Sequence, residues 1–437
     1  MRNFYLSSGF RRKPTRIKPL AAGVIYYYLK PVLGLIRWCF ILWLAGCAGR
    51  FSALAQIDPY PRDLVQLGYN GALEGKSPLA AYMFYYRNSP NFYRTNLTLR
   101  LALAPVYLDA ELGIAQALGE NTDLGIGLAG GGYADSYDEI RGGRFLESES
   151  FTGHGGETSV SLYHCFNPGA QIPLNGMLRG SVHYSTYHAD DSTAATFQLP
   201  GDQTSFAFRT GLRWGGKEPT LFPSLAMELS LWYEGHYRTG SGSYGFAGDR
   251  ELNPFSHLFW LQALLAYTWP ESQHNFYINL TAGSSLDADR FSAYRLGALL
   301  PLVSEFPLSL PGYYFNEISA RNYALLGANY IVPLDHKHHW NINFTGTTAL
   351  VDYLPGLAQA GNWHSGVGAG LLYQAQSVKV MVGYAYGIDA IRSHGRGAQS
   401  LGVLMQFDLG HAWHKLLNPE QPGRWRGFQK VLGLFRD

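Results

Sequence analysis

The chain has 437 residues and a formal net charge of +2, so its charge gives no case for nucleic-acid binding. Only 15% of the residues are charged, against roughly 25% in an ordinary soluble domain, while 15% are aromatic and 51 are glycine. Beyond residue 56 the sequence has no apolar run of the roughly 20 residues that a membrane-spanning helix needs. The composition therefore excludes a helical membrane protein and favours a transmembrane β-barrel, in which alternate side chains face lipid and water.

Residues 1–55 are predicted to be an export signal. A long basic segment precedes the apolar run Trp38–Gly46, and Ala53–Ala55 supplies a small-x-small cleavage pattern. Cleavage there would make Gln56 the first mature residue. A competing interpretation is a lipobox that ends at Cys47, which would become a lipidated N-terminus.

Residues 56–412 are predicted to form an all-β, antiparallel outer-membrane barrel of about sixteen strands. Short runs of alternating character, such as 230–237 and 379–386, are separated by turn residues. Their lengths suit a tilted crossing of the hydrocarbon layer. The predicted strands lie near residues 64–74, 77–87, 94–104, 107–118, 123–134, 157–166, 175–187, 204–215, 224–237, 257–269, 275–285, 321–333, 340–352, 363–375, 379–390 and 399–410.

The predicted connections alternate between short and long from the fourth strand onward. The short ones lie near 119–122, 167–174, 216–223, 270–274, 334–339 and 376–378. The longer ones lie near 135–156, 188–203, 238–256, 286–320, 353–362 and 391–398. Bacterial barrels have short periplasmic turns and longer outer loops, whereas a soluble sandwich or propeller has no reason to sort its loops in this way. We therefore expect the longest connection, 286–320, on the outer side.

Several short motifs resemble the surface-antigen barrel of the Omp85 superfamily over about residues 275–410. In that family a lipophilic-arginine-glycine-aromatic tip lies in the loop between strands eleven and twelve, and the corresponding residues are Leu310, Pro311, Gly312 and Tyr313. The next strand ends in Tyr330–Leu334, which matches an aromatic-x-x-Pro-Leu pattern. Leu350–Asp352 stands in the place of a Phe-x-Asp strand motif, and Gly366–Leu371 resembles a glycine-rich penultimate region.

The sequence departs from this family at the tip. The family's arginine contacts the strand aspartate, but Pro311 stands in its place, as in barrels fused to patatin-type lipases. Asp352 would then need another partner, either Arg295 or Arg321. Family members also carry periplasmic polypeptide-transport (POTRA) repeats before the barrel, and we expect these to be missing or supplied by a separate POTRA-bearing or patatin-like protein.

The resemblance implies a non-enzymatic barrel that translocates or inserts protein or lipid across the outer membrane, with the lipid bilayer as a partner and no cofactor. Two alternatives remain: a porin or specific diffusion channel, and an outer-membrane lipase or deacylase. A translocation barrel predicts a weak seam between the first and last strands and a plug formed by 286–320. A porin predicts a closed seam and an open lumen.

Other motifs favour structural interpretations. Gly125–Gly130 satisfies a dinucleotide-binding pattern but is followed by no helix. His183 and Ser185 have the spacing of a lipase pair, without an identifiable orienting amide, and are interpreted as lumen lining. The turn 335–339 carries three histidines and is interpreted as solvated, with a metal site as the alternative. Cys165, alone in the predicted mature chain, excludes a disulfide framework there.

Residues 413–437 are predicted to be a basic, amphipathic tail beyond the last strand. Such a segment could lie on the inner leaflet, dock in the barrel mouth or remain loose.

Overall fold

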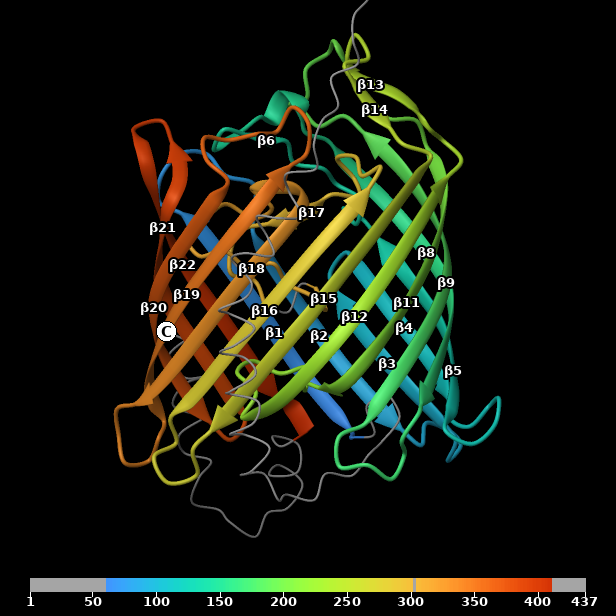
Figure 1. The fold of residues 1–437 in the computed structure, drawn as a ribbon, viewed down its shortest axis with the longest axis vertical. Helices are drawn as coiled ribbons and strands as arrows, with labels where there is room; N and C mark the ends of the chain where they lie inside the picture. The colour runs from blue at the N-terminus through green and yellow to red at the C-terminus, as the bar shows by residue number, and fades with distance from the viewer. Residues whose placement is uncertain (1–59, 302–303, 411–437) are drawn as a thin grey trace, which may run out of the picture. The chain divides into compact units, whose positions relative to one another are not determined.

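The wall of the molecule is a single β-sheet. The structure, a computed structural model, describes residues 60–301 and 304–410. Sixteen antiparallel strands of this part close on themselves, as Figure 1 shows. They are β1 (Arg62–Ala72), β2 (Ala81–Pro90), β3 (Leu97–Ala104), β4 (Tyr107–Ile114), β5 (Thr122–Gly131), β8 (Thr152–Cys165), β9 (Leu174–His188), β11 (Gln203–Gly216), β12 (Leu225–Arg238), β15 (Phe255–Thr268), β16 (Asn275–Leu286), β18 (Ile318–Pro333), β19 (Trp340–Tyr353), β20 (Trp363–Ala375), β21 (Val378–Arg392) and β22 (Gly395–Asp408). Among the residues that the structure describes, no helix is long and apolar enough to cross a membrane.

The predicted fold class and strand number are confirmed, because each of the sixteen predicted strands overlaps one strand of the wall. The predicted long connection at 391–398 is wrong. An irregularity between Gly387 and Ile391 lets β21 and β22 continue pairing to Arg392 and Gly395, so that only a two-residue turn joins them. The predicted signal at 1–55 and the predicted tail at 413–437 lie outside the described residues, and these boundaries stay predictions.

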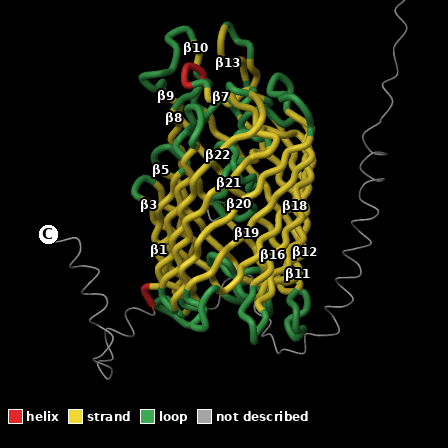
Figure 2. Tube along the Cα trace, turned by 90° about the vertical axis from the view of Figure 1, so that its left-hand side faces the viewer, coloured by secondary structure: helices red, strands yellow, loops and turns green. Residues whose placement is uncertain are grey.

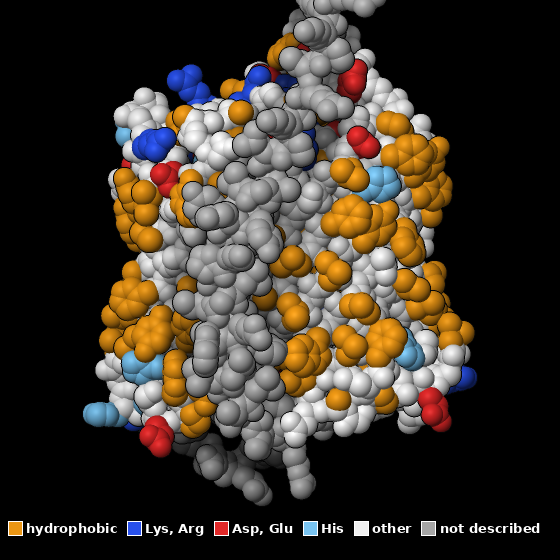
Figure 3. All heavy atoms as spheres, viewed as in Figure 1, with side chains coloured by type: hydrophobic (Ala, Val, Ile, Leu, Met, Phe, Trp, Pro, Cys, Tyr) orange, Lys and Arg blue, Asp and Glu red, His pale blue; other side chains and the backbone are white. Residues whose placement is uncertain are grey.

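Side chains alternate between the two faces of the wall, as the strand pattern predicted. Exposed apolar residues such as Leu128, Phe208 and Leu261 point outward, and Figure 3 shows apolar side chains spread over the wall while charged ones gather at its two ends. Buried polar residues such as Gln66 and Asn343 point into the lumen. This arrangement, apolar outside and polar inside, is what a barrel in a bilayer requires.

The strands of the wall are shortest at β3 and β4. Each of these strands has eight residues, whereas β18 has sixteen. Strand β2 pairs with β3 at six positions only, from Tyr85 with Leu103 to Pro90 with Thr98. Residues 81–84 of β2 therefore pair with β1 alone.

The connections between strands lie alternately at one end of the barrel and at the other, and Figure 2 shows the loops gathered at these two ends. We call the end with the connections 91–96, 115–121, 166–173, 217–224, 269–274, 334–339 and 376–377 the turn end. The opposite end, which we call the loop end, carries the longest connection, between β16 and β18. The predicted placement of residues 286–320 between the eleventh and twelfth strands is confirmed.

A folded cap covers part of the loop end. It contains β6 (Ile140–Arg141), β7 (Arg144–Phe145), the 3₁₀ helix η1 (Glu147–Glu149), β10 (Phe197–Gln198), β13 (Gly242–Phe246) and β14 (Arg250–Leu252). Aromatic residues from four connections form its core, among them Tyr137, Phe151, Phe197, Tyr244 and Phe291. Arg250 is buried beside them and pairs with Glu149 and Glu139.

The cap gives one pH-dependent prediction. Burial raises the pKa of the Asp138 carboxyl above its ordinary 3.8, and the neighbouring Arg295 only reduces this effect. The folded state holds the proton more tightly than the unfolded state, so this group's stabilising contribution is full at low pH and is lost as pH rises through the raised folded pKa. We expect Asp138→Asn to remove that loss. The midpoints of thermal unfolding of the two proteins should converge near about pH 3, and the variant should be the more stable near about pH 7; equal differences at both pH values would contradict this.

Candidate functional site in the barrel lumen

The connection of residues 287–317, here called the lumen loop, folds into the barrel over its described residues 287–301 and 304–317 instead of extending away from it. Leu310 and Tyr313 at its tip are almost completely buried. Gly312 has a φ of +83°, and a Cβ atom added to it would lie 1.9 Å from the backbone nitrogen of Gly387 in β21. A Cβ atom on Gly366 of β20 would lie 2.1 Å from the carbonyl oxygen of Pro311. The tip therefore rests directly on the inner face of β20 and β21, at positions that only glycine allows.

Two tyrosines hold the tip through one histidine. The Tyr313 hydroxyl lies 3.2 Å from Nδ1 of His364, and the Tyr353 hydroxyl lies 2.5 Å from Nε2 of the same ring. His364, on β20, is completely buried. A neutral imidazole has one donor and one acceptor nitrogen, so both ring nitrogens are satisfied by these two hydroxyls.

A buried ion pair fixes the end of the lumen loop. Arg392 of β21 donates two hydrogen bonds of 2.9 Å to the two carboxylate oxygens of Glu317. Their side chains are 3% and 0% exposed, and the guanidinium lies 3.7 Å from the centre of the Tyr314 ring. Glu317 also accepts a 2.8 Å hydrogen bond from the Tyr314 backbone N–H. A bidentate pair of this kind fixes orientation as well as distance.

The middle of the lumen loop is anchored on a different part of the wall. Phe306 packs edge-on against Trp232 of β12 and Trp260 of β15, with ring centres 5.2 and 5.5 Å apart. Glu305 pairs with Arg213 and Arg209 of β11. Since β11 and β12 lie well away from β20 and β21 around the sheet (Figure 1), the lumen loop spans the lumen from wall to wall.

Comparison with known proteins gives fold likeness only. No family model and no curated protein matches the sequence. Among solved structures, CdiB from Escherichia coli has a TM-score of 0.53 at 13% identity, covering 80% of this chain and 63% of that one. CdiB from Acinetobacter baumannii has a TM-score of 0.52 at 10% identity, covering 79% and 60%. BamA from Haemophilus ducreyi lacking POTRA domains 1–3 has a TM-score of 0.51 at 10% identity, covering 79% and 70%.

CdiB and BamA are barrels of the Omp85 superfamily. This chain is similar to them in fold. It spans less than two thirds of the length of the two CdiB chains.

We call the buried ion pair of Glu317 and Arg392 the lock of the loop. Relative to the Omp85 pattern, its two charges are exchanged between loop and strand. The family that the motifs resemble has an arginine on the loop and a carboxylate on the strand, but here the carboxylate, Glu317, belongs to the loop and the arginine, Arg392, to the strand. His364, Glu317 and Arg392 were not predicted as site residues. Glu317 and Arg392 fall in the predicted connections 286–320 and 391–398, so the strand pattern gave no signal for either of them.

Asp352 does not take part in the lock. It lies on the outer face of β19 with 49% of its side chain exposed. Arg321 donates to it at 2.8 and 3.2 Å, and Asn322 donates at 2.7 Å. Of the two predicted partners Arg321 is confirmed and Arg295 is wrong, because Arg295, in β17 (Tyr294–Leu296), donates to the backbone carbonyls of Asn316 and Asp138. The loop is thus held inward although the strand aspartate faces the other way.

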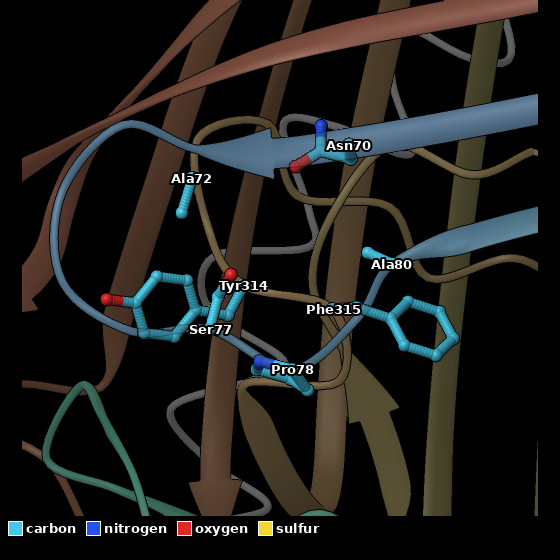
Figure 4. Close-up of a pocket in the computed structure, with 7 residues that line it drawn as sticks. All are labelled: Asn70, Ala72, Ser77, Pro78, Ala80, Tyr314 and Phe315. Atoms are coloured by element: carbon cyan, nitrogen blue, oxygen red, sulfur yellow. The ribbon is translucent and has the colours of Figure 1, made fainter.

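The lumen loop also touches the first strands. The Tyr314 hydroxyl donates a 2.8 Å hydrogen bond to the carbonyl of Glu74, between β1 and β2. Figure 4 shows Tyr314 and Phe315 beside Ser77 and Pro78, around a narrow crevice. A displacement of the loop tip would therefore reach the β1–β2 connection.

The seam between β1 and β22 is paired at nine positions, from Leu64 with Asp408 to Ala72 with Ser400. This is more than the six positions between β2 and β3, so the seam is not the least-paired junction of the wall. The weak seam expected for a translocation barrel is not found in the described strands.

The metal site at 335–339 and the lipase pair with His183, the two alternatives from the sequence, both fall in the part of the chain that the structure describes. No three metal-ligating side chains among its residues lie close enough to hold an ion, and this includes the turn 335–339. His183 faces the lumen and lies 2.8 Å from Asp135, a partner that sequence reasoning did not identify.

We expect the tip hydroxyl to matter modestly. Tyr313→Phe removes the partner of one buried histidine nitrogen and should lower the free energy of unfolding by about 1–3 kcal/mol. Tyr330→Phe, whose hydroxyl bonds His274 in an exposed position, is the matched control. Denaturant titration of both variants measures the difference, and equal losses would contradict a special role for the tip.

Proposed function

We propose that the chain works in the outer membrane, where it translocates or inserts protein or lipid, with the lumen loop as its plug. The observation that carries this proposal is the attachment of the loop to two distant parts of the wall, by Glu305 and Phe306 on one side and by residues 310–317 on the other. A channel for free diffusion does not need a loop fixed across its lumen. The fold likeness to CdiB and BamA supports the same class of activity.

The proposal includes export by the predicted signal at 1–55 and a bilayer as the surrounding medium. It also includes a separate periplasmic protein, POTRA-bearing or patatin-like, that delivers the cargo. The wall contributes no chemistry of its own, and we propose that the chain is not an enzyme. His183→Ala should then leave any phospholipid or lysolipid turnover of the purified protein unchanged, and its loss would support the lipase alternative.

Conductance in planar bilayers tests the plug. The full chain should show little steady current, and deletion of residues 300–316 should produce large pores. A large, steady conductance of the full chain that the deletion leaves unchanged would support the porin alternative instead.

A porin has two observations in its favour, and the first is the closed seam between β1 and β22. The lumen-facing wall of β3, β4, β8 and β9 is polar and partly accessible, with the ion pairs Arg100–Glu111 and Arg179–Glu157. Loss of the chain in its native host separates the two functions: a translocator is needed for particular surface or secreted proteins or lipids, and a porin for the uptake of small solutes.

A further inference from the structure

The turn of residues 217–224, here called the inner turn, leaves the strands that it joins and crosses the turn end of the lumen. It connects β11 to β12, yet its contacts are with β1, β16, β21 and β22. The sequence predicted an ordinary short turn at this place. The structure instead has a segment of chain lying across the mouth of the barrel.

Polar side chains of the wall bind the main chain of the inner turn. Gln66 of β1 donates to the carbonyl of Pro219 at 3.3 Å, and Lys379 of β21 donates to the carbonyls of Leu221 and Phe222 at 2.6 and 3.4 Å. Asn275 of β16 donates to the carbonyl of Pro223 at 3.1 Å. These bonds use backbone groups that every polypeptide carries.

One further bond joins the inner turn to the seam. Gln406 of β22 accepts a 2.9 Å hydrogen bond from the backbone N–H of Leu221. The same oxygen accepts a 2.9 Å bond from Gln66, which lies across the seam on β1. The inner turn is thus tied to the two strands that close the barrel.

Leu221 is the apolar side chain of the inner turn that is buried in the wall, and the partly buried Phe222 packs against the same cluster. Leu221 is 2% exposed and packs in a cluster with the lumen-facing side chains Ile331, Leu372, Met381 and Leu404. Leu299 of the lumen loop packs on the same cluster, so the plug and the inner turn meet there. The wall thus surrounds the Leu221 side chain next to the polar side chains that bond the main chain of the turn.

The conformation of the inner turn is maintained by its contacts with the wall. Phe222 has a φ of +51°, a conformation that costs a bulky residue about 1–3 kcal/mol and persists only where surrounding contacts impose it. Pro219 and Pro223 have no N–H, so they present acceptors only. Strain of this kind favours a segment that can be displaced by a better-fitting one.

We propose that the turn end of the lumen is a binding site for an extended polypeptide segment with one apolar side chain, and that the inner turn occupies this site as a built-in competitor. Binding through main-chain carbonyls and one N–H tolerates many sequences, which suits a chain in transit. The inference rests on the proposed function and narrows its cargo to polypeptide. It also gives that cargo a way to act on the seam, since displacing the inner turn removes the N–H that Gln406 accepts.

A labelled copy of the inner turn tests the site. The probe is a fluorescent peptide with the sequence of residues 217–224, measured by anisotropy against the full chain in detergent. Leu221→Asp should free the site, because a carboxylate is costly to bury there. Leu334→Asp changes a 54% exposed leucine in the turn between β18 and β19 and is the matched control.

We expect the probe to bind Leu221→Asp at least tenfold more tightly than the wild type or Leu334→Asp. Adding Lys379→Met to the first variant should weaken binding again, and a probe with aspartate in place of its leucine should not bind. Equal binding to the two aspartate variants, or binding that Lys379→Met leaves unchanged, would overturn the proposal. If Leu221→Asp does not fold, Leu221→Ala provides the same comparison.

The outcomes separate this inference from the proposed function. Probe binding without any transport defect in cells that lack the chain would leave the site standing and the function wrong. Normal transport without probe binding to a folded variant would overturn the site alone. Displacement of the probe by lysophosphatidylcholine at equal concentration would overturn the choice of polypeptide over lipid.

Discussion

Arg392→Met is expected to lower the free energy of unfolding by about 3–5 kcal/mol, the largest loss for any single change in the lumen. It leaves the Glu317 carboxylate completely buried without its cation, since both partners are almost inaccessible. Urea unfolding in detergent, followed by tryptophan fluorescence, measures the loss. The lumen loop should also leave the wall, so a current should appear in planar bilayers.

The matched control is Arg321→Met, which breaks the exposed pair with Asp352. Exposed pairs contribute about 0–1 kcal/mol, so this variant should remain close to the wild type. The double variant Arg392→Met, Glu317→Gln should recover part of the loss, because it leaves no buried charge alone. Similar losses for Arg392→Met and Arg321→Met would show that the buried pair is not the lock.

Gly366→Ala is expected to displace the loop tip, with a cost of about 1–3 kcal/mol. The added methyl group would lie 2.1 Å from the carbonyl oxygen of Pro311. The three atoms nearest to it all belong to the Pro311 backbone, which cannot turn aside as a side chain can. A cysteine placed at Leu310, which is fully buried in the wild type, should then react with a maleimide reagent.

Gly346→Ala on the neighbouring strand β19 is the control, because a Cβ atom there meets nothing within 4 Å. It should leave the Leu310 cysteine protected and the stability equal or slightly higher. Equal labelling in the two backgrounds would show that the tip does not depend on contact with Gly366.

The strands and their connections could be predicted because a barrel wall imposes a local rule. Each strand must alternate, and each reversal needs turn residues, so both leave a mark in a few neighbouring positions. The tip residues Leu310, Pro311, Gly312 and Tyr313 could be recognised for a related reason, since they form a short contiguous motif.

The lock could not be predicted because its partners are far apart in sequence and do not follow the family pattern. Asp352 was favoured by its motif, yet it faces outward: Val351 and Tyr353 on either side of it are the buried, lumen-facing residues of β19. Glu317 and Arg392 are separated by 75 positions. The inner turn looked ordinary because its prolines are typical of turns, although the apolar pair Leu221 and Phe222 between them is unusual for a solvated one.

The short strands β3 and β4 have a consequence for the surrounding lipid. At about 3.3 Å per residue, a strand of eight residues is about 26 Å long and one of sixteen about 53 Å, before tilt shortens both. A bilayer must match its hydrocarbon thickness to the apolar band that it surrounds, at a cost of a fraction of a kcal/mol per ångström. We therefore expect the membrane to be thinner next to β3 and β4, and β3 lies two strands away from β1, where the barrel closes.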